Sequence, residues 1–232
     1  MRSSLPHVGF PLSPKLQALS NTFLEAAAAN HPKSGEHFYN VIIQLTEEVI
    51  DYLLIQTVSI AQVNSVGQKV FSVCATTSNK ASAMLSAKIY KKAKPAEMQQ
   101  VAALWQGMIK NTQEDQGGVW YLAQPIDAAL AGDLDAILNE KGDQPHFSPN
   151  DVELVMARYE KLFDVIIEGF FLRPSDPVNM GTITRKLLKV GVEGVKQAAS
   201  AVIHKVVKHL EPQHLGNYVD FTAQFYIRSP LN

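Results

Sequence analysis

The segment that decides the fold runs from Val178 to Leu210 and reads VNMGTITRKLLKVGVEGVKQAASAVIHKVVKHL. Its apolar residues recur at steps of four and three, at Leu188, Val192, Val195, Ala199, Val202, Val206 and Leu210. At about 100° per residue these positions fall within one stripe roughly 80° wide, a pattern typical of an amphipathic helix. Burying this stripe contributes on the order of 10–20 kcal/mol before the entropic cost of ordering, which is enough to hold a helix against a core.

The opposite face of this segment is basic. Residues 181–210 contain six Lys or Arg residues and one acid, Glu193, which makes a net charge of +5. The rest of the chain then holds 15 basic and 21 acidic residues, a net charge of −6, although the whole chain is near neutral at −1. We therefore expect the basic helix to complement an acidic body. The row Glu160, Asp164 and Glu168, spaced at i, i+4, is the candidate for facing its lysines.

The composition is that of an ordinary folded protein. Apolar residues make up 46% and charged residues 19% of the 232 positions, enough for a sizeable core. Cys74 is the only cysteine, so the chain has no intramolecular disulfide and no cysteine-ligated zinc site. The uncharged run between Asp51 and Lys69 is too polar to cross a bilayer, and residues 1–13 lack the apolar core of a signal peptide. We expect a cytoplasmic protein.

Helix-start signals divide the rest of the chain. Ser13-Pro14 and Ser148-Pro149 each combine a capping hydroxyl with a proline at the first helical position. Pro95 begins another helix, and Ser34 begins a long one that reaches Val63. For the β-branched end of that long helix, a hairpin around residues 64–67 is the competing interpretation. Two further helices are predicted, each with an interruption: 66–93 near Thr76–Asn79, and 125–138 at Gly132-Asp133.

The C-terminal tail changes period. From Tyr218 to Arg228, apolar residues alternate with more polar ones, at Val219, Phe221, Ala223, Phe225 and Ile227. Strict alternation over this length is typical of a strand. A lone strand needs a partner, and the candidates are residues 119–123, residues 70–75 and a second copy of the chain.

Together these patterns predict an all-α (mainly α) fold, a multi-helix bundle with a short C-terminal strand or extended arm. We expect residues 1–232 to form a single mainly helical domain, with residues 1–13 and 211–232 as extended arms. The polar segment 111–118 contains Gly117-Gly118 and is the candidate for an internal boundary.

No residue pattern identifies a catalytic or metal site. Carboxylate bundles that bind two metal ions use Glu-x-x-His elements, and the one such spacing here, Glu211 to His214, is broken by Pro212. The chain has no Gly-x-Ser-x-Gly element and no His-x-x-x-His pair. Gly191 and Gly194 follow no strand, so we interpret them as close-packing positions and not as a phosphate loop. We name no catalytic residue and no metal ligand. The cofactor is unknown, and the choice between enzyme and non-enzyme stays open with a preference for the latter.

The basic helix allows three interpretations. It faces the core with solvated or paired lysines, or it binds a protein partner or membrane surface, or it binds nucleic acid. Scarce arginine and the absence of aromatic residues make nucleic acid unlikely as a partner. The same lack of Trp and Phe makes a membrane surface a weaker candidate than a protein.

Two hypotheses about function follow. The first is a non-enzymatic helical interaction protein that binds another protein, or itself as a homo-oligomer, through its C-terminal third. Its predicted contact residues are Lys186, Lys189, Lys196, Lys208, Phe221 and Phe225. The alternative is a helical-bundle ligand-binding protein or enzyme, with or without a metal, whose pocket lies between helices near Trp105, Trp120 and Tyr121.

Overall fold

The computed structural model of the chain describes residues 6–60, 63–111, 119–140, 148–205 and 207–228. Within these residues the fold is mainly α with a short C-terminal strand, as the sequence predicts. It also contains a four-stranded sheet, which the sequence patterns did not predict. The predicted internal boundary at 111–118 lies outside the described residues, apart from Asn111.

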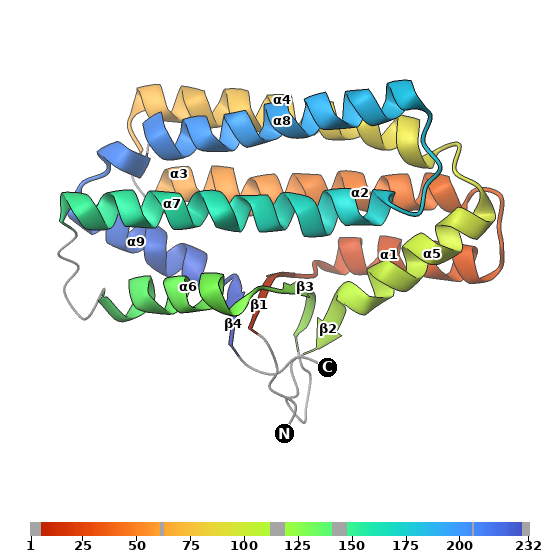
Figure 1. Cartoon of the computed structure of the whole chain (residues 1–232), viewed down its shortest axis with the longest axis horizontal. Coiled ribbons are helices and arrows are strands. Elements are labelled where there is room, and N and C mark those ends of the chain that lie inside the picture. The colour runs from red at the N-terminus through yellow and green to blue at the C-terminus, as the bar shows by residue number, and fades with distance from the viewer. Residues whose placement is uncertain (1–5, 61–62, 112–118, 141–147, 206, 229–232) are drawn as a thin grey trace.

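Two long helices form an outer layer, at the top of Figure 1. These are α4 (Ser65–Tyr90) and α8 (Thr182–Lys205), which pack side by side. The predicted long helix is thus confirmed as α8, although it begins at Thr182 and not at Val178. Its stripe residues Ala199 and Val202 are buried, whereas Val206 lies outside the described residues.

A middle layer lies beneath α4 and α8 (Figure 1). One half is α2 (Ser34–Ile50), which continues through the π-helical segment η1 (Asp51–Gln56) into α3 (Thr57–Ile60). The other half is α7 (Pro149–Ile166), which continues into the π-helical segment η2 (Ile167–Leu172) and the 3₁₀ turn η3 (Arg173–Ser175). Helix α4 packs on α2, and α8 packs on α7.

The remaining elements lie on the far side of the middle layer, at the bottom of Figure 1. Helix α1 packs against α2, and α6 packs against α7. The bounds of these elements are α1 (Pro14–Ala28), α5 (Pro95–Met108), α6 (Ala128–Glu140), α9 (Pro212–Ala223), β1 (His7–Pro11), β2 (Ile109–Asn111), β3 (Trp120–Pro125) and β4 (Tyr226–Ile227). The 3₁₀ turn η4 (Val207–His209) is not part of this group, because it follows α8 and contacts α8 and α7.

Local capping explains why several predicted helix starts are confirmed. The Ser13 hydroxyl accepts a hydrogen bond from the Leu16 N–H, and Pro14 follows as the first helical residue. The Asn64 side chain accepts from the Gly67 N–H in the same way. Asn64 therefore caps α4, and the competing hairpin around residues 64–67 is wrong.

Two predicted helix interruptions are wrong. Helix α4 is continuous through Thr76–Asn79, and α6 is continuous through Gly132-Asp133. Helix α6 also begins later than predicted, because Pro125 belongs to β3 and the Asp127 carboxylate accepts from the Leu130 N–H. Polar or flexible residues inside a helix lower its propensity by about 1 kcal/mol or less each, which tertiary packing readily outweighs.

The predicted strand from Tyr218 to Arg228 is mostly helix. Residues Pro212–Ala223 form α9, and only Tyr226–Ile227 pair as β4. The partner of β4 is β1, which was expected to be part of an extended arm, and neither residues 119–123 nor residues 70–75 pair with it. The sheet order is β2-β3-β1-β4 with antiparallel pairs, and residues 70–75 lie within α4.

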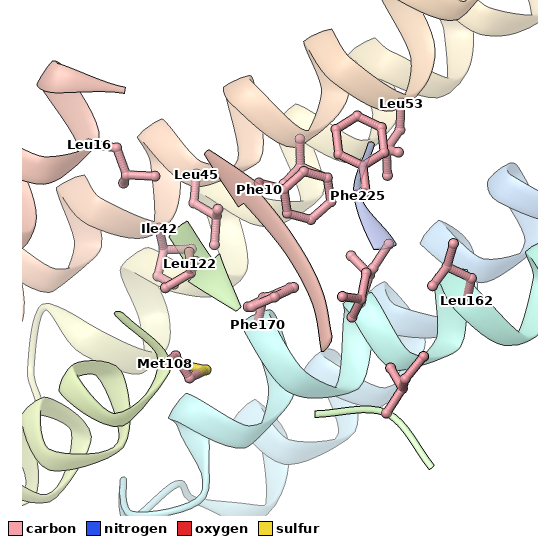
Figure 2. Close-up of a cluster of buried hydrophobic side chains, with 14 of the residues drawn as sticks. Phe10, Leu16, Ile42, Leu45, Leu53, Met108, Leu122, Leu162, Phe170 and Phe225 are labelled. Carbon is pink, nitrogen blue, oxygen red and sulfur yellow. The ribbon is translucent and has the colours of Figure 1, made fainter. Parts of the chain in front are cut away.

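Aromatic side chains join the small sheet to the helices. Phe10 of β1 lies between Phe170 of η2 and Phe225, with ring centroids at 5.8 Å and 5.1 Å (Figure 2). All three side chains are buried. The N-terminal strand β1, the π-helical segment that follows α7 and Phe225 therefore share one core.

No helix in the described part of the chain is both long and apolar enough to cross a membrane.

A candidate ligand cavity between four helices

A cavity of about 120 Å³ lies between the outer and middle layers. Helices α4 and α8 line it from above, and α2 with η1 and α7 with η2 line it from below. Its wall combines residues that are far apart in sequence: Ile42, Thr46, Val49, Ile50, Leu53, Cys74, Ser78, Ala81, Ser82, Leu85, Ser86, Ile89, Tyr90, Phe163, Ile166, Ile167, Phe171, Leu172, Leu188, Gly191, Val192, Val195 and Ala199.

The cavity wall is almost entirely apolar, and none of the described residues that line it is charged. Its polar groups are hydroxyls and one thiol, mostly from α4. The Thr46 hydroxyl lies 2.7 Å from the Ile42 carbonyl oxygen, to which it donates, and 2.6 Å from the Ser82 hydroxyl. Because the Thr46 and Ser82 hydroxyls are satisfied within the protein, they leave their part of the wall chemically suited to hydrocarbon.

Helix packing shapes the cavity. Glycine at position 191 lets α8 approach α4, because a Cβ atom there would lie 2.3 Å from Leu85 Cδ1. The predicted packing role is thus confirmed for Gly191. It is wrong for Gly194, where a Cβ would meet no heavy atom of the described residues within 4 Å.

Both π-helical segments reach the cavity. Leu53 of η1 and Ile167, Phe171 and Leu172 of η2 line it. A π-helical segment holds one extra residue in a helical turn and so changes which side chains face inward, and such segments occur frequently at functional sites. The two segments interrupt α2 and α7 on the same side of the cavity.

Tyr90 and Cys74 are the titratable groups of the wall. Burial raises the pKa of the Tyr90 hydroxyl far above its usual range, and the charge of Asp176 raises it further. That hydroxyl has no hydrogen-bond partner among the described residues. Burial also raises the pKa of the Cys74 thiol, partly offset by a hydrogen bond with Ser78. Both groups are therefore neutral at pH 7, and Cys74 is not an activated nucleophile.

A second, polar groove of about 220 Å³ lies between α7 and α8. Lys196 Nζ lies 2.6 Å from the Asp164 carboxylate, and His204 Nε2 lies 3.1 Å from the Glu160 carboxylate. The Ser200 hydroxyl donates to the same Glu160 oxygen at 2.8 Å. The expectation that the acidic row faces the basic helix is thus confirmed for Glu160 and Asp164.

The polar groove does not have the geometry of a nucleophilic site. Ser200 and His204 both bond to Glu160, so the hydroxyl proton is directed to a carboxylate and not to the imidazole. Phe163 and Ala199 line both the groove and the apolar cavity, and so form the wall between them.

The predicted contact residues do not form one surface. Lys186, Lys189 and Lys208 are exposed, whereas Lys196 is engaged with Asp164. The other two predicted contact residues, Phe221 and Phe225, pack against each other. Phe221 is partly buried, and Phe225 is only 1% exposed. A partner therefore cannot reach Phe225 without a change in the fold.

The tryptophans predicted to mark a pocket do not line this cavity. Trp105 is fully buried and its Nε1 donates to the Ser20 hydroxyl at 3.1 Å. Trp120 and Tyr121 lie on β3. A signal that was missed in the sequence lies in α4, where small side chains recur every four residues at Cys74, Ser78, Ser82 and Ser86. A stripe of small residues facing Gly191 leaves room between the helices.

In the described part of the chain, no group of three or more His, Cys, Asp or Glu residues is placed to hold a metal ion. No protein-family model, curated protein or solved structure matches the chain. The class defined by the fold and the site is therefore a mainly α multi-helix protein with an apolar cavity between its helices.

Proposed function

We propose that this protein is a non-enzymatic binding protein that holds a small apolar molecule, or the apolar part of a larger one, in the cavity between α2, α4, α7 and α8. The observation that carries the proposal is a cavity of about 120 Å³ to whose wall the described part of the chain contributes no charged side chain. An apolar space of this kind is favourable to hydrocarbon and unfavourable to water, because water needs several polar partners.

The size of the cavity limits the ligand. An engineered apolar cavity of about 150 Å³ binds benzene, so the present cavity suits a single ring or a short hydrocarbon segment. Transfer of about six carbons from water contributes about 0.8 kcal/mol each, on the order of 5 kcal/mol, which corresponds to a Kd of about 0.2 mM. A tighter ligand extends beyond the cavity and makes further contacts.

Binding is favoured over catalysis by the chemistry of the wall. Cys74 is held as a neutral thiol, and the Thr46 and Ser82 hydroxyls bond to each other. In the polar groove outside the cavity, the Ser200 hydroxyl and His204 both bond to the Glu160 carboxylate, so the imidazole is not placed to take the hydroxyl proton. A cytoplasmic setting stays a prediction, supported by the single cysteine.

The test uses the full-length protein with toluene as an apolar probe. Toluene raises the Tm of the wild type, because a ligand that binds only the folded state stabilises it. Val195→Phe fills the cavity and abolishes this shift. Val190→Phe, the same substitution at an exposed position of the same helix, keeps it. An unchanged wild-type Tm, or an undiminished shift in Val195→Phe, would contradict the proposal.

A second candidate function is association with a protein partner or a second copy through the C-terminal third. Exposed Ile183 and Val190 next to Lys186 and Lys189 favour it. Light scattering after size-exclusion chromatography tests self-association, comparing the wild type with Ile183→Ser/Val190→Ser. A monomeric wild type removes the homo-oligomer. Surface substitutions are preferable to truncation after Leu210, which deletes the core residue Leu215.

A further inference from the structure

Basic residues are concentrated in the outer layer of the fold, and acidic residues in the rest of the chain. Residues 65–94 (α4 and the four residues that follow it) contain six lysines and no acid, and residues 181–210 contain six basic residues and one acid. These two segments hold 12 of the 21 basic residues and one of the 22 acidic ones, a net charge of +11 against −12 for the rest. Because α4 and α8 lie side by side (Figure 1), this is a separation in space as well as in sequence.

The same layer exposes large aliphatic side chains. Val66, Val73 and Met84 on α4 and Ile183 and Val190 on α8 are between 52% and 78% exposed. Val66, Val73 and Met84 lie on one face of α4, within about 20° of one another around the helix axis, because each residue turns the helix by about 100°. Exposed lysines share these helix faces, so the surface is both basic and apolar: Lys80, Lys91 and Lys186.

The basic groups of this surface are free to meet an external anion. Among the described residues, Lys80, Lys88, Lys186 and Lys189 make no ion pair. Lys91 lies over the Tyr39 ring, with Nζ 4.1 Å from its centroid, and is in no ion pair with a carboxylate of the described residues. A concentration of unpaired like charge costs stability through mutual repulsion, which an anionic partner relieves.

We propose that the outer face of α4 and α8 docks on the surface of an anionic lipid bilayer. The lysines meet the lipid headgroups, and the exposed Val, Met and Ile side chains enter the boundary between headgroups and acyl chains. Basic amphipathic helices bind anionic membranes in this way, with the helix axis in the plane of the surface. Two adjacent helices, one of 26 and one of 24 residues, form a face about 35–40 Å long.

A lipid surface fits this face better than nucleic acid does. Eleven of the 12 basic residues are lysines and one, Arg185, is an arginine. The aromatic residues of the two segments, Phe71 and Tyr90, are buried, so none is available to stack on bases. Exposed aliphatic side chains gain nothing from a phosphate backbone, whereas a bilayer buries them.

Docking also places the cavity near the bilayer. Helices α4 and α8 form both the outer face and the upper wall of the cavity. One helix diameter, about 10 Å, then separates the cavity from the lipid surface. The docking proposal rests on the outer face alone and does not depend on the proposed ligand.

The test is flotation of the full-length protein with vesicles of phosphatidylcholine, with or without phosphatidylserine. The wild type floats with phosphatidylserine vesicles and not with phosphatidylcholine alone, and added salt weakens binding. Lys80→Gln/Lys88→Gln/Lys186→Gln lowers affinity about a hundredfold, at about fivefold per basic residue near an anionic surface. The matched control replaces three exposed lysines outside the outer layer: Lys15→Gln/Lys33→Gln/Lys161→Gln keeps wild-type binding.

Two further variants separate the contribution of the exposed aliphatic side chains from that of the charges, and vesicle docking from ligand binding in the cavity. Ile183→Ser/Val190→Ser lowers affinity at unchanged charge, which a purely ionic attraction does not predict. Val195→Phe keeps vesicle binding, so failure of the ligand cavity and failure of docking are distinct results. The proposal is overturned if phosphatidylserine vesicles do not bind, if both lysine triples bind equally, or if duplex DNA or polyglutamate binds and the vesicles do not.

Discussion

Replacing Ala81 with leucine tests whether the space between the helices is real. Ala81 is a small residue of α4 that lines the cavity. An unfilled cavity costs about 24 cal/mol per Å³, so a volume of about 120 Å³ corresponds to about 3 kcal/mol of lost stability. Leucine adds three carbons, worth about 2.4 kcal/mol when buried, less about 0.5–1 kcal/mol of side-chain entropy. We expect Ala81→Leu to raise the free energy of unfolding by about 1.5 kcal/mol.

Urea unfolding with an unchanged m-value measures this gain. For a chain of this size it corresponds to a rise in Tm of about 3–6 °C. The leucine side chain also occupies the ligand space, so the toluene-induced rise in Tm is lost. The matched control is Ala87→Leu, on the same helix but outside the cavity wall, which changes stability by about 0.5 kcal/mol or less and keeps the toluene effect.

The opposite result would refute the reasoning. Overpacking a filled interior costs about 1–3 kcal/mol. If Ala81→Leu destabilises the protein by this amount and toluene still raises its Tm, then α4 and α8 are packed around position 81 and the ligand binds elsewhere.

Three other predictions follow from buried groups and close contacts. Burial raises the pKa of Tyr90, Tyr159 and Tyr218 in the folded state, so the unfolded state loses these protons first. Stability therefore falls above about pH 10, by about 1.4 kcal/mol per pH unit for each group. Urea unfolding at increasing pH measures the slope, and Tyr159→Phe lowers it by about a third. Burial raises the pKa of the Cys74 thiol, so the rate of its reaction with a maleimide rises with pH around a midpoint above that of a free cysteine. Mass spectrometry measures this rate, and we expect added toluene to slow the reaction. Gly35→Ala places a Cβ atom 2.0 Å from the backbone oxygen of Tyr90, so we expect it to lower the free energy of unfolding, measured in urea, by about 3 kcal/mol or more. The control is Gly107→Ala, whose Cβ atom meets no heavy atom of the described residues within 4 Å and which does not destabilise the protein.

Local chemistry made the helix starts predictable. The Ser13 cap and the prolines at positions 14 and 95 act within one helical turn, so they can be recognised in the sequence without knowledge of the fold. The pairing of the basic helix with Glu160 and Asp164 was also predictable, because opposite charges at helical spacing on two helices indicate facing surfaces.

The C-terminal tail shows where periodicity fails. Its apolar residues alternate, but Leu215, Tyr218, Val219 and Thr222 also fit a helical spacing, and all four are buried. Both patterns coexist in the sequence. Packing of α9 against α6 and α3 selects the helix, which local propensity does not decide.

The sequence by itself determined that the chain is mainly helical, where several helices begin, and that one long helix carries a basic face. Only the tertiary structure decided that β1 pairs with β4, that Phe225 is a core residue, and that α2, α4, α7 and α8 leave a cavity. The reason is physical. Caps and amphipathic stripes depend on neighbours within a few residues, whereas a cavity depends on the distances between helices, to which side chains over 100 positions apart, such as Ile42 and Val195, contribute together.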